Sequence, residues 1–186
     1  EKETLSSRQI DRPIRPLIDK QWTFETQVMA TVVSSDQEHD GDVLALIGGS
    51  ASLVISDIPF PGPVAGVRVG RVEGQWVIMP TFAQLDESDV DIVVAGTATD
   101  IIMVEGGCQE VPEADMIGAL EFAMSYIAKI VAAQNELVRL AGKPKRSPVA
   151  KVDVADLERD LRGAYTERLK AAIRIPGKES RQEEID

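Results

Sequence analysis

The sequence predicts an α/β (α+β) fold, in which a sheet packs with helices, followed by the start of an all-helical domain. Two pairs of alternating segments with short turns between them indicate β-hairpins, and flanking segments with apolar residues every three or four positions indicate helices. Beyond residue 142 the chain becomes more charged, and its apolar residues keep only a helical spacing. A length of 186 residues fits one domain plus part of another.

The composition excludes several classes of protein. A hydrophobic content of 44% is ordinary for a chain that buries a core. No uninterrupted apolar run reaches the roughly 18–20 residues that span a bilayer, so we expect no membrane partner. The single cysteine, Cys108, excludes an internal disulfide and is typical of a reducing compartment, so we expect a cytoplasmic location. The net charge of −11 argues against nucleic acid covering the whole surface but permits one local basic site.

The most informative stretch lies near the N-terminus, where three arginines fall within eight residues. Arg8, Arg12 and Arg15 are spaced i, i+4 and i+7, which places them on one face of a helix expected over residues 4–17, with Thr4 as its N-cap. A guanidinium stays charged at ordinary pH and forks onto phosphate oxygens. The spacing therefore suits binding to a polyphosphate backbone.

The arginines have an equally ordinary alternative role. They could pair with Asp11, Asp19 and other carboxylates as surface ion pairs, and the residues alone leave both roles open. Pro13 also disfavours helical geometry at the residue before it. We therefore expect the helix to end or kink near Arg12, with a short second turn after it, and this makes Arg15 the weaker candidate.

Two elements are expected next. Residues 25–35 alternate and are rich in β-branched side chains, which predicts a strand covered on both faces. Residues 42–56 predict an apolar helix with Asp40 as its N-cap. Gly48 and Gly49 make one side of this helix narrow, so we expect it to pack centrally against a sheet.

The middle of the chain predicts two hairpins. Residues 64–72 and 75–79 alternate on either side of a Glu-Gly turn, and residues 90–95 and 101–105 form a second pair. Between them, Thr81 is placed to cap a short helix that ends near residue 88.

The C-terminal third predicts a domain boundary. A long helix begins at Pro112 and ends at Gly142 as its C-cap, and residues 152–173 predict another helix. A polar tail without a core of its own follows. The expected division is a first domain over residues 1–142, a linker over 143–150 and the start of a helical domain over 151–186.

Two acidic clusters were considered as metal sites. His39 lies close to Asp36, Asp40 and Asp42, but an aspartate-rich turn is usually a solvated turn and helix cap. Asp89 and Asp91 would project to one face of a strand as ligands for a hard cation, but a charged strand entrance near solvent is the favoured interpretation. Cys108 has no activating neighbour. The residues therefore predict no catalytic residue and no metal ligand in this chain.

The sequence resembles the bacterial polynucleotide phosphorylase family (polyribonucleotide nucleotidyltransferases). The matching segments occur in order over about residues 1–146. They are Arg8-Gln9-Ile10-Asp11-Arg12-Pro13-Ile14-Arg15-Pro16-Leu17, Asp42-Val43-Leu44-Ala45, Gly48-Gly49-Ser50-Ala51, Ile58-Pro59-Phe60-Pro61-Gly62-Pro63, Val67-Arg68-Val69-Gly70, Val94-Ala95-Gly96-Thr97, Met103-Val104-Glu105 and Asn135-Glu136-Leu137.

The resemblance implies a fold and a parent activity. Family enzymes carry two ribonuclease PH-like repeats separated by a helical domain, then KH and S1 RNA-binding modules, and form a ring-shaped homotrimer. They degrade RNA from the 3′ end with phosphate as co-substrate and Mg²⁺ bound by the second repeat, and some join RNA-degradation complexes. This chain would be most of the first repeat, a ribonuclease PH-like mixed sheet packed with helices, with the family's first strands preceding Glu1, plus the start of the helical domain.

The resemblance also implies which chemistry this chain lacks. The second repeat binds phosphate through a serine cluster, but residues 39–43 here contain no serine and carry acids. A lysine follows the last catalytic aspartate by two positions in that repeat, and Val93 occupies that position here. The implied role is a non-catalytic portion in which Arg8, Arg12 and, less strongly, Arg15 bind RNA phosphates beside the second repeat. The alternative is a structural assembly module without direct RNA contact.

Overall fold

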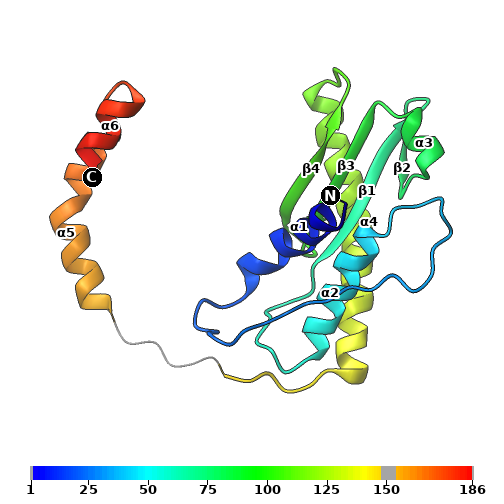
Figure 1. Ribbon diagram of the computed structural model, residues 1–186, viewed down its shortest axis with the longest axis horizontal. Helices are drawn as coiled ribbons and strands as arrows, with labels where there is room; N and C mark the ends of the chain where they lie inside the picture. Colours follow the sequence, from blue (N-terminus) through cyan, green and yellow to red (C-terminus); the bar gives the residue numbers. More distant parts are fainter. Residues whose placement is uncertain (1, 148–153, 186) are drawn as a thin grey trace. The chain divides into compact units, whose positions relative to one another are not determined.

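The computed structural model describes residues 2–147 and 154–185. The chain divides between residues 149 and 150 into two compact units. The first unit contains an antiparallel sheet and most of the helices, and the second is helical (Figure 1). This arrangement confirms the predicted α/β class, but every strand pair in the described part of the chain is antiparallel, so the expected mixed sheet is not observed.

The sheet has four strands in the order β2-β1-β3-β4. The strands are β1 (Ala65–Val72), β2 (Gln75–Ile78), β3 (Val90–Gly96) and β4 (Ile101–Cys108). Both predicted hairpins are confirmed. Glu73 and Gly74 join the first hairpin with φ of 51° and 75°, which is the backbone that a two-residue type I′ turn requires.

Two apolar layers cover the two faces of the sheet. Helix α4 (Glu113–Ala141) packs a buried stripe of Ala119, Ala123 and Ile127 against the face that carries Val67 and Val94. By length and composition, α4 is the one helix among the described residues that could cross a membrane. Because its buried stripe packs on the strands, we interpret it as a core helix.

The opposite face is covered by α1 (Lys2–Ile14) and α2 (Asp42–Ile55). Val43, Leu46 and Leu53 of α2 share a core cluster with residues of β3 and β4. The helix comes so close to β1 that a Cβ at Gly66 would lie 2.7 Å from a Leu46 methyl carbon. The predicted central position of this helix is therefore confirmed.

Residues 25–35 do not form the expected strand. They form no regular element, and Met29 and Val33 are 80% and 93% exposed. A β-branched sequence forms a strand only when a neighbour supplies hydrogen-bond partners, and no described strand pairs with this segment. The prediction of a strand was wrong.

The N-terminal helix also differs from expectation. Helix α1 continues past Pro13 to Ile14, and Thr4 lies inside the helix. Pro13 is buried in the last turn, where the helix is about to end anyway, and the 3₁₀ turn η1 (Arg15–Leu17) supplies the expected second turn. At the start of α2 the N-cap is Gly41, although the Asp40 carboxylate still accepts the Asp42 N–H at 3.2 Å.

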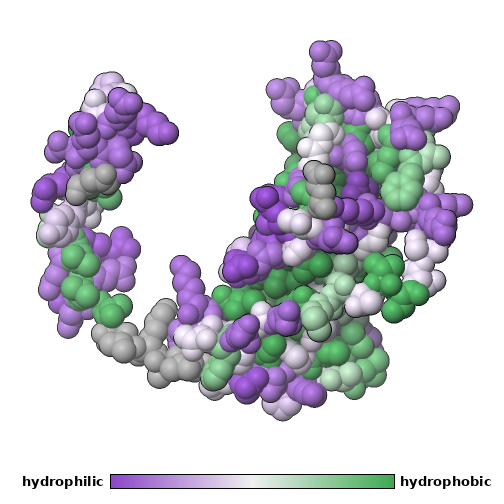
Figure 2. Space-filling model, in the orientation of Figure 1, coloured by the Kyte–Doolittle hydropathy of each residue, from purple (hydrophilic) through white to green (hydrophobic). Residues whose placement is uncertain are grey.

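Three further helices complete the chain. The short helix α3 (Phe82–Asp86) begins with the capping box expected of Thr81. In the second unit, α5 (Ala155–Ala172) confirms the predicted helix, while residues 152 and 153 lie outside the described residues. The polar tail forms α6 (Lys178–Ile185), which was not predicted and has no buried residue. Apolar side chains remain exposed along α5 (Figure 2): Leu157, Leu161, Tyr165 and Leu169.

The start of β1 is fixed by side chains from both helical layers. Ser50 of α2 accepts the Val64 N–H at 2.8 Å, and Gln134 of α4 donates to the Val64 carbonyl at 2.9 Å. All of these groups are buried. If one of them were removed, its hydrogen-bond partner would be left unpaired, because water does not reach it.

Replacing Ser50 with alanine tests this attachment. The variant leaves the buried Val64 N–H unpaired and should lower the free energy of unfolding by about 1–2 kcal/mol. Denaturant unfolding followed by circular dichroism measures the change. Ser125→Ala is the control, because Ser125 is exposed and bonds only within its own helix. Equal stability of the two variants would contradict the role assigned to Ser50.

Candidate functional site

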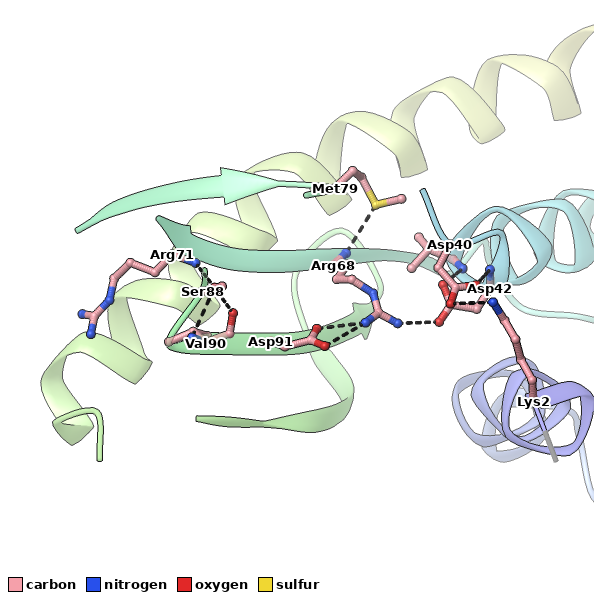
Figure 3. A network of polar contacts seen from close by, with 10 residues as sticks. Lys2, Asp40, Asp42, Arg68, Arg71, Met79, Ser88, Val90 and Asp91 are labelled. Carbon is pink, nitrogen blue, oxygen red and sulfur yellow. Dashed lines mark hydrogen bonds and ion pairs between the residues drawn. The ribbon is translucent and has the colours of Figure 1, made fainter. Parts of the chain in front are cut away.

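A largely buried arginine side chain, Arg68, organises the polar face between the sheet and α2. The Arg68 side chain leaves β1 on the face opposite α4, and Figure 3 shows it between Asp42 and Asp91. Its Nη2 donates to Asp42 Oδ2 at 2.7 Å, and its Nη1 donates to both Asp91 oxygens at 2.9 and 3.0 Å. The Arg68 and Asp42 side chains are only 15% and 5% exposed, so this ion pair is shielded from water.

The cluster holds its charges firmly. Burial alone would lower the pKa of Arg68, but attraction to Asp42 and Asp91 outweighs burial and the pKa is raised. A guanidinium whose partners are this close remains charged, and each carboxylate is neutralised by it. Arg68 Nε is buried without a hydrogen-bond partner among the described residues, so the side chain sits there at some cost in solvation.

The N-terminus of α2 is blocked to outside anions. A helix N-terminus ordinarily attracts a phosphate through its free N–H groups. Here the Asp42 carboxylate accepts the Val43 N–H at 2.7 Å, and Asp40 lies alongside in an ion pair of 3.1 Å with Lys2 (Figure 3). A phosphate at this position would meet two carboxylates.

A second arginine neutralises the other aspartate of the strand entrance. Arg71 forks onto Asp89 and donates to Asp115 of α4 at 2.7 Å, with its guanidinium 5.3 Å from the centre of the Trp76 ring. Its hydrogen bonds lower the pKa of Asp89, and the same bonds raise the pKa of Arg71. This arrangement ties the β1 end, the entrance to β3 and the first turn of α4 together.

Asp89 and Asp91 both line an open depression of about 390 Å³. The exposed Cys108 and Gly107 of β4 lie on its rim. Arg71 and Arg68 donate hydrogen bonds to Asp89 and Asp91, so the oxygens of both carboxylates already have partners. The depression therefore offers a cation far weaker ligands than two free carboxylates would.

The aspartate-rich turn before α2 is an ordinary turn. Asp36 accepts the backbone N–H groups of Glu38 and His39 at 2.9 and 3.0 Å and contacts the His39 ring. Hydrogen bonding by Glu38 first, and by His39 second, lowers the pKa of Asp36 to about 2. Within residues 2–147 and 154–185 no group of three His, Cys, Asp or Glu side chains is placed to hold a metal ion.

The three N-terminal arginines are not equivalent. Arg12 forms an ion pair with Glu105 of β4, and Arg15 forms one with Asp11 at 2.6 Å. Arg8 is exposed and has no ion-pair partner in the described part of the chain. Among these three arginines, Arg8 is therefore the one whose guanidinium meets no carboxylate in the described part of the chain.

Sequence reasoning missed the two arginines that define the site. The segment VRVGRV was read only as an alternating strand, although charged residues at positions 68 and 71 of a largely buried strand signal partners close by. The carboxylates that these two arginines contact come from α2, from the bend before β3, from β3 and from α4.

Comparison with known proteins confirms the resemblance. Residues 62–126 match the model of the 3′ exoribonuclease family, domain 2. The chain is 50% identical over 184 residues to the polyribonucleotide nucleotidyltransferase of Geobacter sulfurreducens, covering 98% of this chain and 26% of that protein. It is 49% identical over 185 residues to the same enzyme of Heliobacterium modesticaldum, again covering 26% of the relative. The chain therefore spans about a quarter of the length of these relatives.

Removing the central guanidinium should be costly. Arg68→Met leaves the buried Asp42 carboxylate without its cationic partner and should lower the free energy of unfolding by about 3 kcal/mol. Arg139→Met is the matched control, since its pair with Glu136 is 69% and 55% exposed and should change stability by less than about 1 kcal/mol. Denaturant unfolding that gives the two variants equal stability would rule out a central role for Arg68.

The Asp89–Arg71 pair predicts a pH dependence. The lowered pKa means that the folded state favours the carboxylate. The stabilisation is therefore complete above the ordinary aspartate pKa of about 3.9 and is lost as pH falls through the folded-state value. The difference in unfolding free energy between wild type and Asp89→Asn should be largest near neutral pH and shrink below about pH 4. A difference that stays constant as the pH falls would contradict the assignment.

Proposed function

We propose that this chain is the non-catalytic, RNA-positioning portion of a phosphate-dependent 3′-to-5′ exoribonuclease, a polyribonucleotide nucleotidyltransferase. The similarity of its full length to a quarter of such enzymes supports the parent activity. The observation that carries the non-catalytic role is the engagement of Asp42, Asp89 and Asp91 by Arg68 and Arg71.

The carboxylates within residues 2–147 and 154–185 do not fit a Mg²⁺ site. A hard cation needs several oxygen ligands with free lone pairs, and a guanidinium at hydrogen-bond distance competes for the same oxygens. Asp89 and Asp91 each meet an arginine at 2.9 Å, so the positive charge that a metal would supply is already present. Under the proposed function, Mg²⁺ and the phosphate co-substrate therefore bind to another part of the parent enzyme, its second ribonuclease PH-like repeat.

Under this proposal the RNA contacts the arginines of α1. Phosphate contacts position a nucleic acid without reading its sequence, and charge-assisted bonds from arginine are the usual means. Arg8 is free, and Arg12 is 43% exposed although it pairs with Glu105, so phosphates could compete for it. Arg15 contributes less because Asp11 holds it in two contacts of 2.6 and 2.9 Å.

A second candidate function is a structural assembly module without RNA contact. One observation favours it: α4 carries exposed apolar side chains on its outer side, with Ile117 and Leu140 58% and 68% exposed. Such residues commonly pack against another subunit or repeat. In this version the chain would build the ring of a homotrimer, and light scattering of the purified chain would find an oligomer that ignores RNA.

RNA binding by α1 is directly testable with the full chain. Fluorescence anisotropy with a labelled single-stranded RNA should show that Arg8→Ala weakens binding and reduces the slope of log affinity against log salt by about 0.7. Arg8→Ala with Arg12→Ala should abolish detectable binding. Arg139→Ala, an exposed arginine on α4, is the control and should bind as wild type does. Wild-type affinity in the double variant would exclude this RNA-positioning role.

A further inference from the structure

The chain turns sharply where α4 ends. Gly142 is extended, with φ of −67° and ψ of 143°, and its N–H donates to the Val138 carbonyl at 2.7 Å. A Cβ at this position would lie 2.5 Å from that same carbonyl oxygen, so the turn requires glycine. The following residues run along the C-terminal end of α2. The backbone N–H of Lys143 donates to the Ile55 carbonyl at 3.0 Å, and the backbone N–H of Arg146 donates to the Asp57 carbonyl at 2.8 Å.

Lys145 caps the end of α2 from a distance of about 90 residues along the chain. Its ammonium donates to the carbonyls of Leu53, Val54 and Ser56 at 3.0, 2.9 and 2.8 Å. The last carbonyls of a helix lack partners within it and carry the negative end of its dipole. A lysine that meets three such carbonyls uses all three of its donors.

Arg146 extends the attachment to the segment after η1. Its guanidinium pairs with the Asp57 carboxylate at 2.9 Å and lies 5.0 Å from the centre of the Trp22 ring. Trp22 is itself fixed by a hydrogen bond of 2.8 Å from its ring N–H to Thr26. The segment that follows the arginine-bearing helix α1 is therefore joined to the segment that leaves α4.

These contacts are all polar or cationic, and residues 143–147 are exposed. No apolar side chain from this stretch enters either core cluster. Such an attachment can open without unfolding the core, because local opening costs only the contacts it breaks. α4 differs in this respect, since its stripe lies at 0–3% exposure against the sheet.

We infer that residues 143–146 are an exit strap, a conformational device that docks on the end of α2 and on Trp22 and fixes the course of the chain directly after α4. When the strap is docked, the backbone of residues 143–146 follows the end of α2. When it is released, these residues are held only through Gly142. The strap occupies the first four residues of the predicted linker, and its action is independent of RNA binding.

Hydrogen exchange measured by mass spectrometry on the full chain tests the strap. Lys145→Met keeps the length of the side chain and removes its three bonds, so the amides of Lys143, Lys145 and Arg146 should exchange about tenfold faster or more. Lys143→Met is the matched control, because the Lys143 ammonium has no hydrogen-bond or ion-pair partner among the described residues. It should exchange within about twofold of wild type, and in both variants the peptide over residues 119–131 should stay protected.

A second variant keeps the test decisive if Lys145→Met is unstable. Asp57→Asn removes only the charge that Arg146 meets and should also speed exchange in the strap while sparing α4. Lys145→Arg retains a cationic donor and should restore part of the protection. Exchange in the strap that stays at the wild-type rate in both Lys145→Met and Asp57→Asn would overturn the inference. Loss of protection in α4 together with the strap in both variants would overturn it as well.

Discussion

The Arg68 guanidinium, held between Asp42 and Asp91, is the interaction on which the polar face of the first unit depends. It joins the start of α2 to the centre of the sheet, and water has little access to its pair with Asp42, because the two side chains are 15% and 5% exposed. Removing one member of a buried ion pair is strongly destabilising. The unpaired carboxylate lowers the free energy of unfolding by several times the amount that an exposed ion pair contributes. The same contact that fixes α2 on the sheet also occupies the carboxylates that could have served chemistry.

The two faces of the sheet therefore have different functions. The face toward α4 is an apolar layer of valine, isoleucine and alanine whose role is stability. The face toward α1 and α2 is apolar at its base and polar near the N-terminus of α2, where Arg68, Asp40 and Lys2 meet. Arg71 lies near the C-terminal end of β1 and links this strand to α4 through Asp115. Under the proposed function, Arg68 and Arg71 neutralise carboxylates of this chain, and Arg8 on α1 remains available to bind a phosphate.

Local signals predicted the elements whose information is local. The hairpin at Glu73-Gly74, the Thr81 cap and α4 each need only neighbouring residues, and all three are confirmed. Residues 25–35 failed because a strand exists only when another strand pairs with it. The site was harder still, since the partners of Arg68 lie 23 and 26 positions away and the partner of Arg12 lies 93 positions away. Strand register and helix docking bring those residues together, and neither can be derived from a run of residue types.

Under the proposed function, this chain contacts RNA but performs no chemistry on it. The most direct measurement incubates the purified chain with end-labelled single-stranded RNA, Mg²⁺ and inorganic phosphate, and follows the release of nucleoside diphosphates. With Arg68 and Arg71 engaging Asp42, Asp89 and Asp91, the chain should bind the RNA and release no nucleoside diphosphate at any phosphate concentration. Phosphate-dependent release that Asp91→Asn abolishes would contradict the account, because it would place a working catalytic centre in this chain.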